Sequence, residues 1–381
     1  MYNDLVTLIK DIYPNQKIIS LHEPKLIGNE QTYLEDAIKS SYVSSVGPFV
    51  NKFEEQLAKY LDVKHVILTV NATSALHISL KLLGANNDTE VLTQSLTFVA
   101  SCNAIYYCNS NPVFIDVDKN TLGLSADSLE FFLEKNCLIK DDGSCWNKNT
   151  NRKVVSCLPM HTFGFPVEID KIKNICNKYN IELIEDAAEA MGSYYKDIHL
   201  GNFGKLGIFS FNGNKILTSG NGGAIITNDD TLADKARHIT TTARIKNQWY
   251  IEHDEIGYNY RMSNLNAAVG LAQLENLEYF LKNKRMLGKK YQEKLKSEHF
   301  YLFKETENSN ANYWLNVLIA NSKKERDSIL DITNKNNILT RPAWTPMHHL
   351  SMNKSCYFEN LENTNFLFDR IVNIPSSVTN N

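Results

Sequence analysis

The sequence predicts an α/β fold in which a large, mostly parallel sheet of seven strands is covered by helices and followed by a smaller α+β domain. The first observation is that short apolar runs alternate with helically periodic segments between about residues 64 and 229. The second is that this alternation ends near residue 245, where long amphipathic segments begin. Continuous apolar strands separated by helices indicate a parallel sheet that is buried on both faces.

Seven apolar segments, most of them rich in β-branched residues, supply the predicted strands of the large sheet. They cover residues 64–70, 90–98, 112–118, 153–161, 181–188, 205–211 and 222–229. The predicted helices between them cover 72–84, 125–135 and 168–180, and the second begins with Ser125, a residue type that caps helices. The asparagine-rich insert at 141–152 is predicted to be a surface loop.

The chain of 381 residues is longer than one hydrophobic core usually serves, so we expect two domains. We predict an N-terminal arm at 1–30, a large domain at 31–245 and a small C-terminal α+β domain at 246–381. The predicted elements of the small domain are helices within 264–298 and at 325–337, and strands at 313–320 and 338–344.

The composition excludes several classes of protein. A net charge of −3 gives no sign of a nucleic acid or an anionic membrane as partner. The seven cysteines are scattered and form no C-x-x-C pair, which favours reduced thiols over disulfides or a zinc site, and we expect no metal. The N-terminus mixes charges into its apolar residues, and no apolar run reaches membrane-spanning length. We therefore expect a cytoplasmic protein.

Residues that could take part in catalysis or binding follow the ends of the predicted strands. Lys215 is the only charged residue in SFNGNKILTSGNGG (210–223), Asp186 ends another strand, and Thr73 with Ser74 opens a helix. Each has an ordinary explanation as a surface lysine, a helix-capping aspartate or a helix cap. Because the carboxyl ends of parallel strands meet at one edge of a sheet, however, these side chains are expected to share a crevice with Ser210 and Phe98.

This set of side chains fits pyridoxal phosphate. A lysine can bond covalently to the cofactor aldehyde and later move a proton, and an aspartate keeps the pyridine nitrogen protonated. Phe98 is placed to stack on the ring, although an aromatic residue there is more often part of the core. Hydroxyl groups and N–H groups at a helix start bind phosphate. The sequence therefore predicts Lys215 and Asp186 as the catalytic pair.

The chain resembles the sugar-nucleotide aminotransferases of the DegT/DnrJ/StrS family over nearly its whole length. The resemblance is carried by segments 69–80, 96–105, 159–170, 185–229 and 257–268. It implies an aspartate-aminotransferase-like fold (fold type I) with pyridoxal 5'-phosphate as cofactor. It also implies that Asn259 reaches the phosphate from the neighbouring subunit, so that a homodimer shares its active sites. The remaining positions assigned to the cofactor by this resemblance are Thr73, Ser74, Phe98, Asp186, Ser210 and Lys215.

Glu189 departs from many members of that family, which carry histidine or glutamine near the phenolic oxygen of the cofactor. An ionised carboxylate beside a phenolate would be repelled. Glu189 is therefore expected to be protonated, turned away or engaged by another group. His161, at a predicted strand end, is either a substrate contact or a packed loop histidine.

The resemblance implies transfer of an amino group from L-glutamate to a keto sugar carried on a nucleotide, in the synthesis of surface-glycan amino sugars such as those of O-antigen lipopolysaccharide. Within the family, the chain is similar to the subset that acts at C4 of UDP-2-acetamido-4-keto-6-deoxyhexoses, as in legionaminic-type nonulosonic acid pathways. Arg244 and Lys246 are candidates for contacts to the diphosphate, and Trp249 and Tyr313 for contacts to the uracil or sugar.

Other functions stay open at this point. The same chemistry on a dTDP- or GDP-linked sugar, or at C3, is the main alternative. A sugar dehydratase of the same family carries histidine in place of the lysine, so Lys215 argues against it. A regulator without activity is disfavoured by the intact set of Lys215, Asp186 and Ser210, and no DNA-binding module accompanies it.

Overall fold

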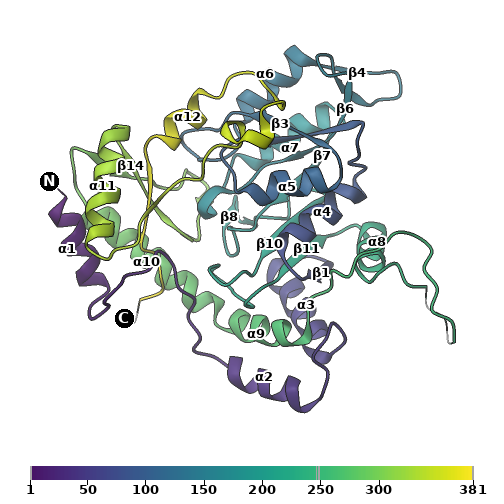
Figure 1. Cartoon of the computed structure of the whole chain (residues 1–381), viewed down its shortest axis with the longest axis horizontal. Helices are drawn as coiled ribbons and strands as arrows, with labels where there is room; N and C mark the ends of the chain where they lie inside the picture. Colours follow the sequence, from purple (N-terminus) through teal and green to yellow (C-terminus); the bar gives the residue numbers. More distant parts are fainter. Residues whose placement is uncertain (1, 246, 248, 380–381) are drawn as a thin grey trace.

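The seven predicted strands form one sheet in the computed structural model, which describes residues 2–245, 247 and 249–379 (Figure 1). The strand order is β1-β11-β10-β7-β6-β2-β3. All neighbours are parallel except β11, which is antiparallel to both β1 and β10. The mostly parallel sheet is thereby confirmed. The strands are β1 (His65–Thr69), β2 (Thr89–Gln94), β3 (Asn111–Ile115), β6 (Arg152–Leu158), β7 (Glu182–Asp186), β10 (Leu206–Ser210) and β11 (Gly223–Thr227).

Helices cover both faces of this sheet because alternate residues of each strand point to opposite sides. On β1, Val66 and Leu68 join one apolar cluster and Ile67 joins the other. The first cluster includes α3 (Pro48–Leu61), α6 (Ala126–Asn136) and α7 (Ile169–Lys178), and the second includes α4 (Ala72–Leu82), α5 (Val99–Tyr107) and α8 (Asp230–Thr240). The result is the three-layer arrangement of helix, sheet and helix.

The sheet is wider than predicted. Beside β3 lies β16 (Tyr357–Phe358), a parallel strand from the C-terminal part of the chain. The insert at 141–152, predicted to be a loop, instead contributes β5 (Cys145–Asn147), which pairs with β4 (Cys137–Ile139) and with β6. Cys145 is fully buried, so this part of the insert packs against the sheet.

The small domain is built on a four-stranded antiparallel sheet in the order β12-β14-β17-β15. Helix α1, within the predicted arm, packs into the same core through Leu5, Val6, Ile9 and Ile12. The first part of the arm is therefore a helix of the small domain. The elements concerned are α1 (Asn3–Ile12), α10 (Leu277–Lys294), α11 (Lys323–Lys335), β12 (Phe300–Leu302), β14 (Asn316–Ala320), β15 (Arg341–Pro342) and β17 (Ile371–Ile374).

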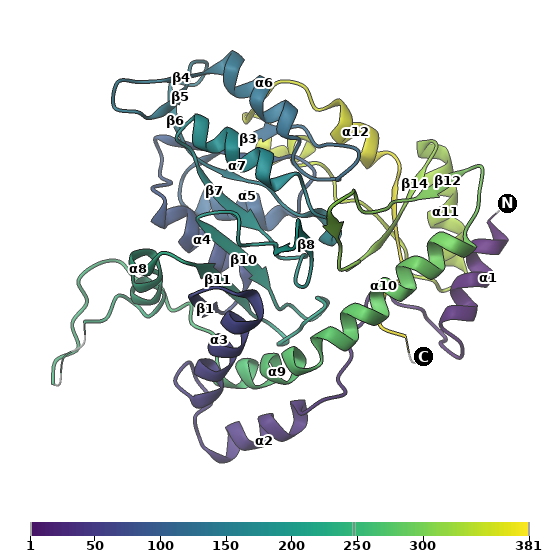
Figure 2. The ribbon, with the colours of Figure 1, turned by 180° about the vertical axis from the view of Figure 1, so that it is seen from behind.

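Several segments connect the two parts. Helix α9 (Asn264–Glu275) packs beside α2 (Glu30–Lys39) and α3, and α10 continues from it toward the small domain (Figure 2). Helix α9 and strand β16 follow residue 246 in the sequence but pack against elements of the large domain. The position of the boundary between the two domains therefore stays a prediction. The other elements are β8 (Tyr194–Tyr195), β9 (Ile198–His199), β13 (Ser309–Asn310), α12 (Glu362–Phe368) and the 3-10 turns Thr162–Gly164, Met347–His349 and Ser351–Asn353.

Among the described residues, no helix is both long and apolar enough to cross a membrane.

Candidate active site

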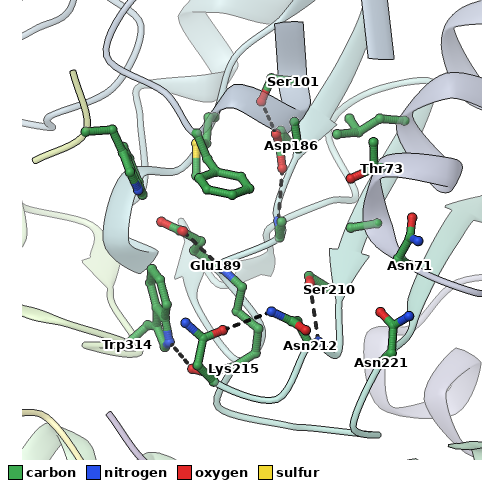
Figure 3. Close-up of a pocket in the computed structure, with 18 residues that line it drawn as sticks. Asn71, Thr73, Ser101, Asp186, Glu189, Ser210, Asn212, Lys215, Asn221 and Trp314 are labelled. Atoms are coloured by element: carbon green, nitrogen blue, oxygen red, sulfur yellow. Dashed lines mark hydrogen bonds and ion pairs between the residues drawn. The ribbon is translucent and has the colours of Figure 1, made fainter. Parts of the chain in front are cut away.

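A cavity of about 330 Å³ opens where β7 and β10 end, between the large sheet and the small domain. Figure 3 shows the side chains that line it, with Lys215 and Glu189 pointing toward each other. Its position at the carboxyl ends of parallel strands is the one where ligands bind in open α/β sheets. The lining residues are Asn71, Ala72, Thr73, Leu76, Phe98, Ala100, Ser101, Met160, Asp186, Ala188, Glu189, Ser210, Asn212, Asn214, Lys215, Asn221, Trp314 and Trp344.

Asp186, the last residue of β7, points its carboxyl group into this cavity. Its Oδ2 accepts a hydrogen bond from the Ser101 hydroxyl at 2.7 Å, and its Oδ1 accepts one from the Ala188 backbone N–H at 3.2 Å. The residue is only 2% exposed. Burial raises the pKa of Asp186 above its ordinary value, although Ser101, Ala188 and the Lys215 cation oppose that shift. The carboxylate is held in place, and within the described part of the chain no salt bridge reaches it.

Glu185, one residue earlier, points to the opposite side of the sheet. Its carboxylate accepts backbone N–H bonds from Gly201 at 2.9 Å, Phe203 at 2.6 Å and Gly204 at 2.8 Å. His161 Nε2 lies 3.1 Å from the same carboxylate, and its Nδ1 accepts the N–H of Val167 at 3.3 Å. His161 is fully buried and does not line the cavity, so the structure favours the packed-histidine interpretation.

Lys215 follows β10 in a tight turn, and its side chain lines the cavity together with the aromatic residues. Its Nζ lies 3.0 Å from Glu189 Oε1 and 3.8 Å from the centroid of the Trp314 ring. Glu189 Oε2 also accepts the N–H of Phe163 at 2.9 Å. Burial raises the pKa of Glu189, and the Lys215 cation opposes that shift. Of the three expectations for Glu189, the structure corresponds to engagement by another group, which is Lys215.

Three aromatic side chains line the cavity. Trp314 donates its indole N–H to the Asn214 carbonyl at 2.8 Å, which fixes the ring over Lys215. Phe98 is 48% exposed, and its ring lies edge-on to Trp344 with the centroids 6.1 Å apart. Phe98 thus has a free face on the cavity, as a ring-stacking residue requires.

The start of α4 forms the polar end of the cavity. The Asn71 side chain caps the helix by accepting the Ser74 N–H at 2.8 Å. The N–H groups of Ala72 and Thr73 come before the first intrahelical bonds, so they remain available to an anion. Thr73 and Ser210 line the cavity, whereas Ser74 is buried behind them and does not. A Cβ on Gly223 would lie 2.5 Å from the Ala72 nitrogen, so β11 approaches this end closely only because that residue is glycine.

Tyr313 does not reach the cavity. It is 5% exposed, its ring packs edge-on against Phe165 with centroids 5.3 Å apart, and its hydroxyl accepts a hydrogen bond from Gln292. Its backbone φ of 50° lies in the left-handed region and turns the chain so that the next residue, Trp314, faces the cavity instead.

The other predicted substrate and partner-subunit positions lie on the segment between α8 and α9, which extends away from the body of the molecule (Figures 1 and 2). Asn259 is exposed and forms a β-bridge with Thr241. Arg244 is exposed beside His253, and Trp249 is 80% exposed. None of these three lines the cavity of this chain. Lys246 lies outside the described residues.

Several cavity residues were not predicted from the sequence. Ser101 lies one helical turn after Phe98, so its spacing from that residue is a signal that could have found it. Trp314 and Trp344 carry no comparable signal, because they come from separate segments of the C-terminal half. The other cavity residues that were not predicted are Asn71, Ala72, Leu76, Ala100, Met160, Ala188, Asn212, Asn214 and Asn221.

Comparison with known proteins identifies a family match over nearly the whole chain. The family model for DegT/DnrJ/EryC1/StrS aminotransferases matches residues 24–380. GDP-perosamine synthase of Vibrio cholerae is 34% identical over 337 residues, which are 88% of this chain and 87% of that protein. The UDP-4-amino-4,6-dideoxy-N-acetyl-beta-L-altrosamine transaminase of Campylobacter jejuni is 34% identical over 269 residues, 70% of this chain and 67% of that protein.

The fold is shared with solved structures at lower sequence identity. The aminotransferase TlmJ from Streptoalloteichus hindustanus superimposes with a TM-score of 0.85, at 24% identity, over 94% of this chain and 93% of its own. The predicted fold, the assignment as an aminotransferase and the use of pyridoxal phosphate are confirmed by these comparisons. The chain belongs to the DegT/DnrJ/EryC1/StrS family of pyridoxal phosphate-dependent aminotransferases.

Proposed function

We propose that this enzyme transfers the amino group of L-glutamate to C4 of a nucleotide-linked 4-keto-6-deoxy sugar in the synthesis of surface-polysaccharide amino sugars. The observation that carries the proposal is that the Lys215 amine and the Asp186 carboxyl group line one cavity, with an anion-binding helix start at its edge. The names of the curated relatives support the substrate class, since both are enzymes that make amino sugars on a nucleotide.

The residues present fit pyridoxal phosphate. The N–H groups of Ala72 and Thr73 and the Ser210 hydroxyl would hold the phosphate. Asp186 would hold the ring nitrogen, Phe98 would stack on the ring, and Lys215 would bond to the aldehyde. When bound, the cofactor supplies an electron sink that makes the proton on the amine-bearing carbon acidic.

The protein's own groups then have defined tasks. Lys215 Nζ takes a proton from the amine-bearing carbon of the donor and, in the second half of the reaction, delivers a proton to C4 of the acceptor sugar. Glu189 accepts a hydrogen bond from that amine, and the Trp314 face limits its movement, so the proton-carrying group stays within the cavity. The negative charge of Asp186 would stabilise the positive charge on the protonated ring nitrogen of the cofactor.

The nucleotide is the open part of this proposal. The resemblance within the family favours a UDP-linked 2-acetamido sugar, whereas relatives named GDP-perosamine synthase favour a GDP-linked one. Incubation with glutamate and a panel of UDP-, GDP- and dTDP-linked 4-keto-6-deoxy sugars, with 3-keto sugars as controls, tests both. We expect an amine at C4 and no product with Lys215→Ala. An amine only at C3, or no amino sugar from any of them, contradicts the proposal.

A homodimer is part of the same proposal. Asn259 lies outside this chain's own cavity, so only Asn259 of a second copy would complete the phosphate site. The segment that carries it also exposes a run of large apolar side chains, which a second copy would cover. They are Ile245, Trp249, Tyr250, Ile251 and Ile256. On this proposal Arg244 and Trp249 contact the sugar nucleotide at the edge of the partner's site, and the role expected for Lys246 stays a prediction from the sequence.

A further inference from the structure

Lys284 is a buried lysine that the proposed reaction does not use. It lies on α10, and its side chain is fully buried. Within the described part of the chain no salt bridge reaches its amine, which instead donates to the backbone carbonyls of Trp314, at 3.1 Å, and Ser376. Burial lowers the pKa of Lys284 well below its ordinary value. A neutral amine still has two N–H groups, so both carbonyls keep a donor in either charge state.

A buried lysine without a carboxylate partner is costly for the fold. An apolar side chain of similar length, such as methionine, would fill the same space without that cost. What methionine cannot supply is an N–H donor to the two carbonyls. Among the described residues, Lys284 is the one hydrogen-bond donor to the Trp314 carbonyl. A buried carbonyl without a donor is unfavourable, so the backbone at Trp314 depends on this lysine.

The backbone immediately before Trp314 is strained. Tyr313 has a φ of 50°, in the left-handed region that residues with a Cβ seldom adopt. Such conformations persist only where the surrounding contacts hold them. On one side of Tyr313, the Asn312 side chain accepts the Trp314 N–H at 2.8 Å, and on the other side Lys284 holds the Trp314 carbonyl. Loss of either bond would let Tyr313 relax and turn Trp314.

The direction of Trp314 matters because its ring covers Lys215 (Figure 3). The indole N–H donates to the Asn214 carbonyl at 2.8 Å, one residue before Lys215. The ring centroid lies 3.8 Å from Lys215 Nζ, and the Lys215 side chain is only 14% exposed. A chain of contacts therefore runs from Lys284 through Trp314 to the amine of Lys215.

We propose that Lys284 is a positioning residue for the reaction, because its bond to the Trp314 carbonyl holds the indole ring over the amine of Lys215. The inference rests on the proposed function, in which Lys215 carries the proton, and deepens it. The ring restricts the conformations of the lysine side chain and attracts its cationic form. A ring that turns away leaves the amine free to move, so it spends less time beside the reacting carbon.

The first test measures the Lys215 amine in the full chain without cofactor, so it does not depend on the reaction. Acetic anhydride acylates neutral amines, and peptide mass spectrometry reports the rate at Lys215 separately from every other lysine. We expect Lys284→Met to raise that rate about five-fold, because the covering ring and its contact with the cation are both lost. Trp314→Ala should give the same rise, and adding Lys284→Met to it should give no further one.

Asn283, the neighbour of Lys284 on α10, provides the matched control. Its amide donates to the Thr379 hydroxyl at 3.0 Å and accepts the Thr379 N–H at 2.9 Å. It therefore holds the same segment after β17 that Lys284 holds through Ser376, but it has no hydrogen bond to Trp314. Asn283→Ala should lower Tm as Lys284→Met does, yet leave the acylation rate of Lys215 at the wild-type value.

Turnover of the holoenzyme gives a second readout. We expect Lys284→Met to lower kcat about ten-fold without a change in KM for glutamate or the sugar nucleotide. Lys284→Gln keeps N–H donors on a side chain one bond shorter, so it should lie between, and it serves both tests if Lys284→Met does not fold. If no keto sugar is aminated but acylation of Lys215 responds as expected, the proposed function fails and the positioning role stands.

Three results would each overturn the inference. The first is an acylation rate at Lys215 that stays at the wild-type value in both Lys284 variants. The second is an equal rise with Asn283→Ala, which would make the effect one of general stability. The third is an additive effect of the Lys284 and Trp314 substitutions, which would show that the two residues act independently.

Discussion

Asp186→Asn should make the protein without cofactor more stable at neutral pH, although it removes a catalytic group. The Asp186 carboxyl group is 2% exposed and has only the Ser101 hydroxyl and the Ala188 N–H as hydrogen-bond donors. Burial outweighs those two bonds, because the pKa is raised above the ordinary 3.8. A folded state with a raised carboxyl pKa binds its proton more tightly than the unfolded state does. The wild type therefore loses stability as pH rises from 3.8 through the folded pKa.

Asparagine has the same shape and no charge, so the variant avoids this loss. Within that pH window the stability difference between variant and wild type should change by up to about 1.4 kcal/mol per pH unit, the value for one proton. For a chain of this length, about 1 kcal/mol corresponds to about 1 °C in Tm. Thermal melts of the two proteins without cofactor, recorded from pH 8 downward, measure the difference, which should shrink as the pH approaches 3.8.

Glu185→Gln is the matched control, because Glu185 is the buried neighbour on the same strand. Its carboxylate accepts three backbone N–H groups, which one amide oxygen cannot replace. That variant should be destabilised by about 1–3 kcal/mol for each N–H left unpaired. Added pyridoxal phosphate should reverse the order for Asp186→Asn, since each ten-fold loss of affinity removes about 1.4 kcal/mol of ligand stabilisation. A variant that melts below wild type at pH 7 without cofactor would refute this reasoning.

Two further predictions concern the cofactor and the dimer. Borohydride reduction of the holoenzyme should attach the cofactor to Lys215, and Lys215→Ala should abolish turnover because both the covalent link and the proton carrier are lost; mass spectrometry that finds the adduct on another lysine contradicts this. Mixed dimers of Lys215→Ala and Asn259→Ala subunits should regain activity that neither parent has to the same degree, because one of the two sites then combines an intact lysine with an intact asparagine; activity that stays at the level of the parents, or a fully active monomer by sedimentation, argues against a shared site.

The sequence placed the residues at strand ends well, because their positions follow from the topology of a parallel sheet. Lys215, Asp186, Ser210, Thr73 and Phe98 all line the cavity. Each comes directly after or close to the end of an apolar segment, so the fold class alone was enough to bring them together.

The residues from the small domain were beyond prediction, because their direction depends on the local backbone and on tertiary packing. Tyr313 and Trp314 are neighbours, and only the left-handed φ of Tyr313 determines which of them faces the cavity. His161 was ambiguous for a related reason, since its partner Glu185 alternates with Asp186 across β7. A difference of one residue changes the face on which a side chain lies.

The edge strand β16 has a consequence for how the protein is made. It pairs with β3 although it is translated long after that strand, and helix α1 belongs to a core completed by β17, which is translated later still. Neither domain can reach its final form on the ribosome until these late segments have emerged. Contacts between such distant parts of a chain form slowly, so truncation at either end should yield aggregation rather than an isolated folded domain.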